Sequence, residues 1–182
     1  EMELREDPEV ILGKTDQPDC LDQGQPQTIE VNQTDADAYN NLGSVLVGQG
    51  KLEEAAQAYH CALEINPNDA DTYNNLGSVL VGQGKLEEAV QAYHQALEIS
   101  PNDADVHYNL GRALVGQRQL EEAVQVYHQA LGINSDDADV YYSLGEVLTE
   151  QGKLEEAIQS YAKALEINPD LTAVYNNLGP VL

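Results

Sequence analysis

The chain has 182 residues, of which eight are lysine or arginine and 32 are aspartate or glutamate, so its formal net charge is -24. A charge of this sign repels phosphate backbones and anionic lipid headgroups, which argues against nucleic acid and membranes as partners. The chain contains neither phenylalanine nor tryptophan, so its core has to be built in thin layers from smaller aliphatic residues and tyrosine. The acidic charge either keeps a long surface solvated or attracts a basic partner, and composition alone does not decide between these two.

Residues 1–35 form a segment of different character, in which prolines interrupt any helical period and acidic residues are frequent. We expect a flexible or extended acidic tail. The alternative is an autoinhibitory segment that lies in a groove of the folded part, with Ile29 and Val31 as anchors. Everything after this segment, residues 36–182, reads as one repetitive domain.

The two cysteines of the chain are Cys20, in the tail, and Cys61, which we expect on an outward-facing part of a helix. Two such cysteines predict no disulfide framework and fit a reducing compartment, so we expect a cytoplasmic protein. No apolar run approaches the length of a membrane span or of a signal-peptide core.

From residue 36 onward the sequence repeats every 34 residues, and a Leu-Gly pair marks each unit at the same step. The first two units differ at only four of their 34 positions. A unit this short cannot bury its own apolar face, so it has to stack on its neighbours and form an elongated solenoid. The four complete units and the partial fifth are 36–69, 70–103, 104–137, 138–171 and 172–182.

Within the first unit, the spacing of apolar residues predicts an antiparallel pair of helices. One stripe at i, i+3, i+4 and i+7 is formed by Tyr39, Leu42, Gly43 and Leu46. This stripe predicts a helix from about Asp37 to Gln49, which ends at Gly50, a residue suited to the left-handed conformation. The helical spacing restarts after Lys51 and stops before Pro67, which lacks an amide donor.

This pattern resembles the signature of the tetratricopeptide repeat, and it is carried by Tyr39, Leu42-Gly43, Leu46, Ala55, Tyr59, Ala62 and Pro67. The resemblance covers residues 36–182. It implies an all-α, right-handed superhelix of helix pairs in which the first helix of each pair lines a concave groove. We expect the small residues Gly43, Ala55 and Ala62 where the two helices approach most closely, and Tyr39 and Tyr59 in the gaps between pairs.

The third unit departs most from the pattern, and we expect the lowest local stability there. Its departures are His107, Arg118, Gly132 and Ser135. At these four positions the other complete units have tyrosine, glycine, glutamate and proline, in that order. A left-handed conformation at Arg118 would cost about 1 kcal/mol, so we predict that its turn relaxes to a different geometry.

Residues suited to catalysis or metal binding recur, but not in converging sets. The histidines His60, His94 and His128 lie one repeat apart, a separation of about 8–10 Å that prevents them from sharing a metal ion. The carboxylate pairs that begin with Glu53, Glu87, Glu121 and Glu155 open second helices, where they favour the positive helix end. We therefore predict no enzyme activity, no metal and no cofactor.

A column of amides lies on the first helices, on the face away from the apolar stripe, at Asn41, Asn75, Asn109 and Asn177. Ser143 interrupts it. The column is similar to the asparagine ladder in the superhelical repeats of O-linked N-acetylglucosamine transferase, which implies that it holds the main chain of an extended peptide. The alternative is that these amides only satisfy neighbouring polar groups or water.

Beside this column, the predicted groove changes character along the chain. One column consists of Asn40, Asn74, Tyr108 and Tyr142, and another of Ser44, Ser78, Arg112 and Glu146. We expect a binding hot spot at Tyr108, Arg112 and Tyr142, with aromatic platforms and one cation. Three glycines, Gly48, Gly82 and Gly116, are expected to admit a partner's backbone, and four aspartates either cap helices or form a rim for a basic ligand: Asp37, Asp71, Asp105 and Asp139.

The sequence therefore predicts a noncatalytic scaffold that binds an extended segment of a partner protein in its groove, and a basic segment is one of the two interpretations of the charge. One alternative is the substrate-recruiting repeat region of a larger transferase. Another is a self-assembly module, because residues 172–182 reproduce a first helix that Pro180 interrupts and no second helix covers. In that case we expect a homodimer through the C-terminal end.

Overall fold

The structure, a computed structural model, describes residues 35–178. Within this range the chain forms nine α-helices and no strand: α1 (Ala36–Gly48), α2 (Leu52–Ile65), α3 (Ala70–Gly82), α4 (Leu86–Ile99), α5 (Ala104–Gly116), α6 (Leu120–Ile133), α7 (Ala138–Glu150), α8 (Leu154–Ile167) and α9 (Thr172–Leu178). The predictions for the tail, including Ile29, Val31 and Cys20, and for Pro180 fall on residues outside those that the structure describes.

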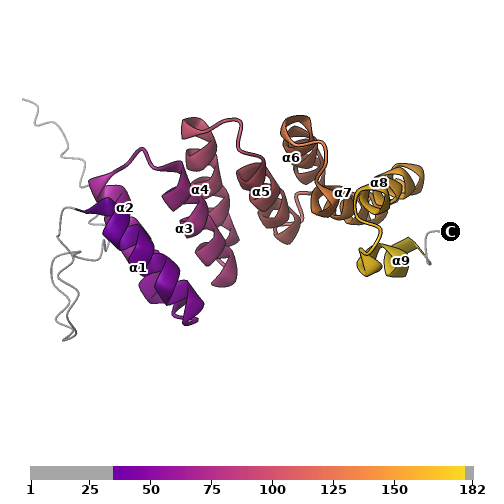
Figure 1. The fold of residues 1–182 in the computed structure, drawn as a ribbon. Coiled ribbons are helices and arrows are strands. Elements are labelled where there is room, and N and C mark those ends of the chain that lie inside the picture. The colour runs from indigo at the N-terminus through magenta and orange to yellow at the C-terminus, as the bar shows by residue number, and fades with distance from the viewer. Residues whose placement is uncertain (1–34, 179–182) are drawn as a thin grey trace, which may run out of the picture.

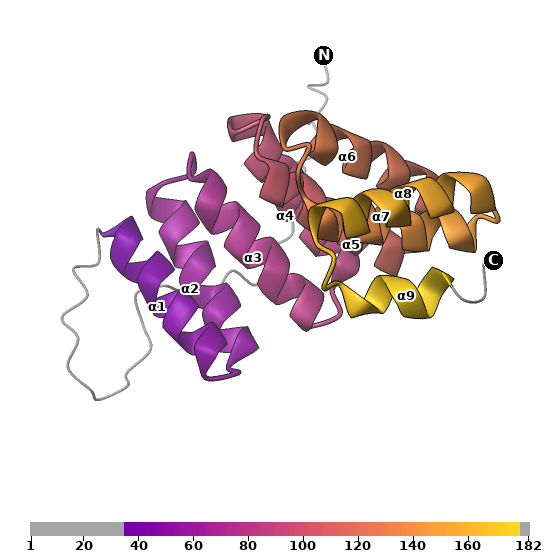
Figure 2. The same cartoon turned by 45° about the vertical axis from the view of Figure 1, so that its right-hand side comes forward.

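Successive helices form pairs that stack in chain order into an elongated solenoid, from α1 and α2 at one end to α9 at the other (Figures 1 and 2). Each second helix packs on the first helix of its own pair and on the first helix of the next. The first helices also contact one another directly, α1 with α3, α3 with α5 and α5 with α7. The predicted all-α solenoid of helix pairs is confirmed, and the odd-numbered helices share one wall of it.

The first helices begin at aspartate caps that come two residues before the predicted acidic column. The side chain of Asp69 accepts hydrogen bonds from the backbone N–H groups of Asp71 and Thr72, and Asp103 and Asp137 cap their helices in the same way. Asp35 caps α1 by accepting from the N–H of Ala38 alone. The aspartates at positions such as Asp71 are exposed residues of the first turn and do not cap. The capping interpretation of the predicted acidic column was wrong, because the first helices begin one residue earlier than predicted. The carboxylates of that column instead interact favourably with the positive end of the helix.

Glycine and tyrosine make the closest approach between the two helices of a pair. A Cβ atom added to Gly77 would lie 2.6 Å from Cε1 of Tyr93, and Gly43, Gly111 and Gly145 meet Tyr59, Tyr127 and Tyr161 in the same way. All four tyrosines are at least 98 % buried. The prediction that Tyr59 lies between pairs is therefore wrong. Tyr59 fills space inside its own pair, because Gly43 has no side chain and leaves room for the whole ring.

Arg118 adopts the left-handed backbone conformation, which contradicts the predicted relaxed turn. Its φ is 64°, against 74° to 76° for the glycines at the corresponding positions of the other three units, Gly50, Gly84 and Gly152. The hydrogen bonds match as well, since the N–H of Gln119 reaches the carbonyl of Leu114 as that of Lys85 reaches Leu80. The helices on either side fix this turn by their packing, and this outweighs a local cost of about 1 kcal/mol.

His107 takes the place of a tyrosine in the third unit and lies buried, with 8 % of its surface exposed. Its Nε2 atom is 3.0 Å from the carbonyl oxygen of Pro101, a contact that the hydroxyl of Tyr175 makes at 3.5 Å with Pro169 in the last unit. The Nδ1 atom of His107 is buried without a hydrogen-bond partner. An unpaired buried nitrogen costs free energy, and the lower stability expected for the third unit stays a prediction.

Cys61 was predicted on an outward-facing part of its helix, and in the structure it is shielded from solvent. Only 4 % of its surface is exposed and it is disulfide-bonded, whereas Gln95, Gln129 and Lys163 at the same step are exposed. The cysteine argument for a reducing compartment therefore has no basis in the structure.

Candidate functional site

The amides and aromatic residues predicted for the groove lie on the wall of the odd-numbered helices. Asn41 and Arg112 are exposed, and the others are partly buried: Asn40, Asn74, Asn75, Tyr108, Asn109, Tyr142 and Asn177. Among the described residues of these helices, Arg112 is the only lysine or arginine. The sequence thus placed the candidate residues on one wall, as helix periodicity requires.

Hydrogen bonds between successive first helices connect the two predicted amide columns. The side-chain N–H of Asn75 donates to Oδ1 of Asn40 at 3.2 Å, and that of Asn109 donates to Oδ1 of Asn74 at 3.1 Å. Each bond uses one of the two N–H donors of the amide and leaves the other donor and the carbonyl oxygen. Sequence reasoning missed these bonds because the two partners are 35 residues apart and belong to different columns.

The series changes in the last two units. The side-chain N–H groups of Asn177 donate to the hydroxyl of Tyr142 at 3.1 Å and to Oε1 of Glu146 at 3.2 Å. Ser143, the residue that interrupts the amide column, instead lines a hollow together with Tyr127. The wall is therefore an amide series over α1, α3 and α5, and a tyrosine–glutamate–amide cluster from α7 to α9.

Tyr108 and Tyr142, the two predicted aromatic platforms, pack against buried tyrosines of their own helix pairs. The ring centroids of Tyr108 and Tyr127 are 6.1 Å apart, as are those of Tyr142 and Tyr161. The guanidinium of Arg112 lies 5.8 Å from the centroid of Tyr108, so a cation–π contact holds this charge against the wall. The predicted hot-spot residues are thus fixed by packing.

The hydroxyl of Tyr142 donates to Oε1 of Glu146 at 2.7 Å. Burial and the adjacent Glu146 carboxylate raise the pKa of Tyr142 to about 12. Burial also raises the pKa values of Tyr93, Tyr127 and Tyr161. Tyr142 therefore stays a neutral hydrogen-bond donor well above neutral pH.

Two of the glycines predicted to admit a partner's backbone have a different neighbour. A Cβ atom on Gly82 would lie 3.0 Å from a methyl group of Leu52, and one on Gly116 would lie 2.9 Å from Leu86. These glycines make room for the second helix of the preceding unit, so the prediction was wrong for them. Gly48 has open space beside it.

The histidine column and the glutamate pairs lie outside this wall. His60, His94 and His128 are exposed, and the glutamate pairs occupy the first turns of α2, α4, α6 and α8. In the described part of the chain, no group of three or more histidine, cysteine, aspartate or glutamate residues is placed to hold a metal ion. None of the helices described is long and apolar enough to cross a membrane.

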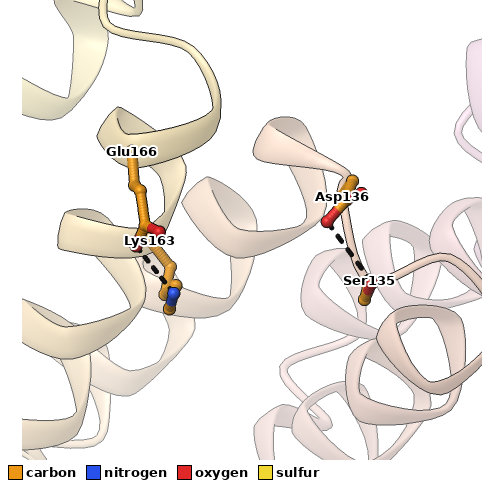
Figure 3. A network of polar contacts seen from close by, with 4 residues as sticks. All are labelled: Ser135, Asp136, Lys163 and Glu166. Atoms are coloured by element: carbon orange, nitrogen blue, oxygen red, sulfur yellow. Dashed lines mark hydrogen bonds and ion pairs between the residues drawn. The ribbon is translucent and has the colours of Figure 1, made fainter.

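Some polar contacts outside the wall are exposed. Figure 3 shows two of them: Ser135 donates to Asp136 at 3.3 Å in the turn before α7, and Lys163 donates to Glu166 at 2.6 Å on α8. The hydrogen bond that Lys163 donates to Glu166 raises the pKa of Lys163. Exposed contacts of this kind contribute little to stability and offer no enclosed site.

The sequence matches the tetratricopeptide repeat family over residues 27–57, 43–84, 77–118 and 108–171. No curated protein sequence matches the chain. Among solved structures, it is similar to YrrB, described as a TPR protein with an unusual peptide-binding site, at 30 % identity over 84 % of this chain and 79 % of that one, with a TM-score of 0.72.

Two further structures are similar over most of the chain. The MamA protein is 26 % identical over 83 % of this chain and 82 % of its own, with a TM-score of 0.76. PilF from Pseudomonas aeruginosa is 28 % identical over 83 % of this chain and 68 % of its own, with a TM-score of 0.74.

Proposed function

The chain belongs to the tetratricopeptide repeat family, and from this premise we propose that it is a noncatalytic scaffold that binds an extended segment of a partner protein along the wall of its odd-numbered helices. The observation that carries the proposal is the series of hydrogen bonds from Asn75 to Asn40 and from Asn109 to Asn74. Each bond fixes the orientation of an amide whose remaining donor and acceptor can pair with peptide main chain.

Fixed side chains lower the cost of binding, because their rotamers are already restricted before the partner arrives. An extended main chain offers N–H and C=O groups at regular intervals, which is what a series of amides on stacked helices can bind without reading side chains. Affinity in the first half of the wall then depends little on the sequence of the partner. This is the role that the resemblance to the asparagine ladder implies.

The charge of the chain favours a basic segment as the partner. At -24, the chain attracts cations over a distance and increases their rate of association at low salt. Binding is then expected to weaken as ionic strength rises, with the larger effect on the association rate.

The test compares two triple variants in affinity capture from the source extract. The first carries Asn75→Ala, Asn109→Ala and Arg112→Ala on the wall, and the second carries Gln95→Ala, Gln129→Ala and His128→Ala at exposed positions of α4 and α6. We expect the first variant to lose the captured proteins and the second to retain them, with both showing the helical circular dichroism of the parent. Equal capture by the two variants would contradict the proposal.

A further inference from the structure

A hollow of about 320 Å³ lies between α5 and α7 on the wall of the odd-numbered helices. Its apolar lining is formed by Val115, Tyr127 and Val147, of which Tyr127 is 1 % and Val147 is 2 % exposed. Ser143 completes the lining at the place where the amide column is interrupted. The hollow is therefore large enough for one long side chain and has walls that a hydrocarbon stem can cover.

The polar lining of this hollow carries positive charge on one helix and negative charge on the other. Arg112 lies on α5, and Glu146 and Glu150 lie on α7. The two glutamates are four residues apart, so they are neighbours on one face of the helix, one turn from each other.

Existing contacts hold all three charges in place. The Arg112 guanidinium lies against Tyr108 at 5.8 Å, Glu146 accepts from Tyr142, and Glu150 pairs with the exposed Arg118 at 2.5 Å. A carboxylate has room for several hydrogen bonds, so each glutamate keeps acceptor capacity for a ligand. The charges are thus positioned before any ligand binds.

The corresponding positions of the first two units have the same apolar residues but no charge. Where the hollow has Arg112, Ser143, Glu146 and Glu150, the earlier units have Ser44, Asn75, Ser78 and Gly82. The apolar positions are unchanged, with Val47, Tyr59 and Val79 in place of Val115, Tyr127 and Val147. The difference replaces an amide with a smaller serine and adds two carboxylates and one guanidinium.

We propose that this hollow is a subsite for a lysine or arginine side chain of the bound segment, a proposal that rests on the proposed function. The aliphatic stem of such a side chain packs on Val115 and Val147, and its charged end pairs with Glu146 and Glu150. Arg112, on the opposite side, repels a second cation and favours a neutral or acidic neighbour in the segment. The first half of the wall then binds main chain, and this hollow reads one side chain.

The test uses fluorescein-labelled peptides of serine and glycine that differ only at a central residue, which is lysine, arginine, norleucine or glutamate. Norleucine keeps the aliphatic stem of lysine and lacks its charge. In fluorescence anisotropy at low salt, we expect the lysine and arginine peptides to bind about fivefold more tightly than the norleucine peptide. The glutamate peptide is expected to bind most weakly.

Three variants locate the effect. Glu146→Ser installs the residue of the first two units at an exposed position, and Glu150→Gln removes the second carboxylate; each is expected to reduce the preference for lysine over norleucine to less than about twofold. Glu155→Gln removes the same charge from an exposed site in the first turn of α8 and is expected to leave the preference unchanged. An equal loss of preference in Glu155→Gln would overturn the subsite, since net charge would then account for it.

The remaining outcomes separate this proposal from the proposed function. If all peptides bind equally and Asn75→Ala with Asn109→Ala weakens them together, the subsite is wrong and the groove stands. If the glutamate peptide binds most tightly, Arg112 selects an acidic side chain and the subsite is also wrong. If no peptide binds at millimolar concentration, both proposals are contradicted.

Discussion

The first two units and the third and fourth units share the glycine–tyrosine contact inside each helix pair and differ on their walls. In both halves a glycine of the first helix faces a buried tyrosine of the second, as Gly77 faces Tyr93 and Gly111 faces Tyr127. On the wall, by contrast, Asn74 corresponds to Tyr108. The comparison teaches that packing restricts the residues between helices, while residues on the wall vary without changing the fold.

Under the proposed function, this difference makes the second half of the wall the selective one. The first half presents amides and serines, which pair with any main chain, and the second presents aromatic rings and charges that distinguish one side chain from another. A partner segment that lies across both halves would be bound through its main chain in the first half and selected by a side chain in the second.

The largest effect is expected from Gly77→Ala and Gly111→Ala, which test whether the interior is the same in both halves. Each added methyl group would overlap the ring of a buried tyrosine, so each variant is expected to lose about 1–3 kcal/mol of unfolding free energy. Guanidinium titration followed by circular dichroism measures the loss. A loss in one half only would show that the two interiors differ.

Gly132→Ala is the matched control for these variants. Gly132 lies in the last turn of α6, and an added Cβ atom would meet nothing within 4 Å. We expect a gain of about 0.5–1 kcal/mol, because alanine loses less conformational entropy on folding than glycine. A gain of stability at Gly132 and a loss at Gly111, in the same helix pair, would show that the loss at Gly111 comes from overlap with Tyr127.

A smaller effect is expected from the amide bonds between units. Asn75→Ala and Asn109→Ala each remove one bond and are expected to cost about 0.5–1.5 kcal/mol. Hydrogen exchange of α3 and α5 measures this, since the bonds join neighbouring first helices. Protection that stays unchanged in both variants would mean that the amides contribute nothing to stacking and serve binding alone.

At the Arg118 turn we expect a change in stability of about the same size, but here a substitution to glycine is expected to be the favourable one. Arg118→Gly should be more stable than Arg118→Ala by about 1 kcal/mol, because both lose the exposed pair with Glu150 and only glycine relieves the left-handed backbone. Gly84→Arg places the same residue in the second unit and should cost about 1 kcal/mol relative to the parent. Thermal melting of the three variants measures both differences; equal melting of Arg118→Gly and Arg118→Ala would mean that φ at this turn carries no cost.

The smallest effect concerns Tyr142, which has no counterpart in the first two units. Its raised pKa, about 12, depends on burial and on Glu146, so Glu146→Gln is expected to lower it toward the ordinary value. Titration of ¹³C-labelled tyrosine by nuclear magnetic resonance measures the shift. An unchanged pKa would show that burial alone accounts for it.

The same tyrosines give the protein a defined alkaline limit. Unfolded tyrosines ionise near pH 10, while the folded ones hold their protons to higher pH, so above pH 10 the folded state binds more protons than the unfolded state. The free energy of unfolding should therefore fall as the pH rises above 10. Urea titrations on either side of that pH measure the slope, and stability that is flat or rising there would contradict the raised pKa values.

The sequence predicted most of the helix pairs and the wall because both depend on the period of 3.6 residues per turn. The helix expected from Asp37 to Gln49 is α1, shifted by one residue at each end, and Asn75 and Asn109 lie on the wall as predicted. The hollow between α5 and α7 was not predicted, although Arg112 and Glu146 had been singled out. Glu150 gave no signal because its relation to Arg112 depends on how two units stack.

The repeating order of apolar, small and turn-forming residues by itself determined that this chain is a solenoid of helix pairs, because local spacing decides which side chains share a helix face. Only the tertiary structure decided that Arg118 is left-handed, that Cys61 is buried and that Gly82 packs against Leu52. Each of these depends on groups brought close by folding, and the energy of those contacts exceeds the preference of a single residue.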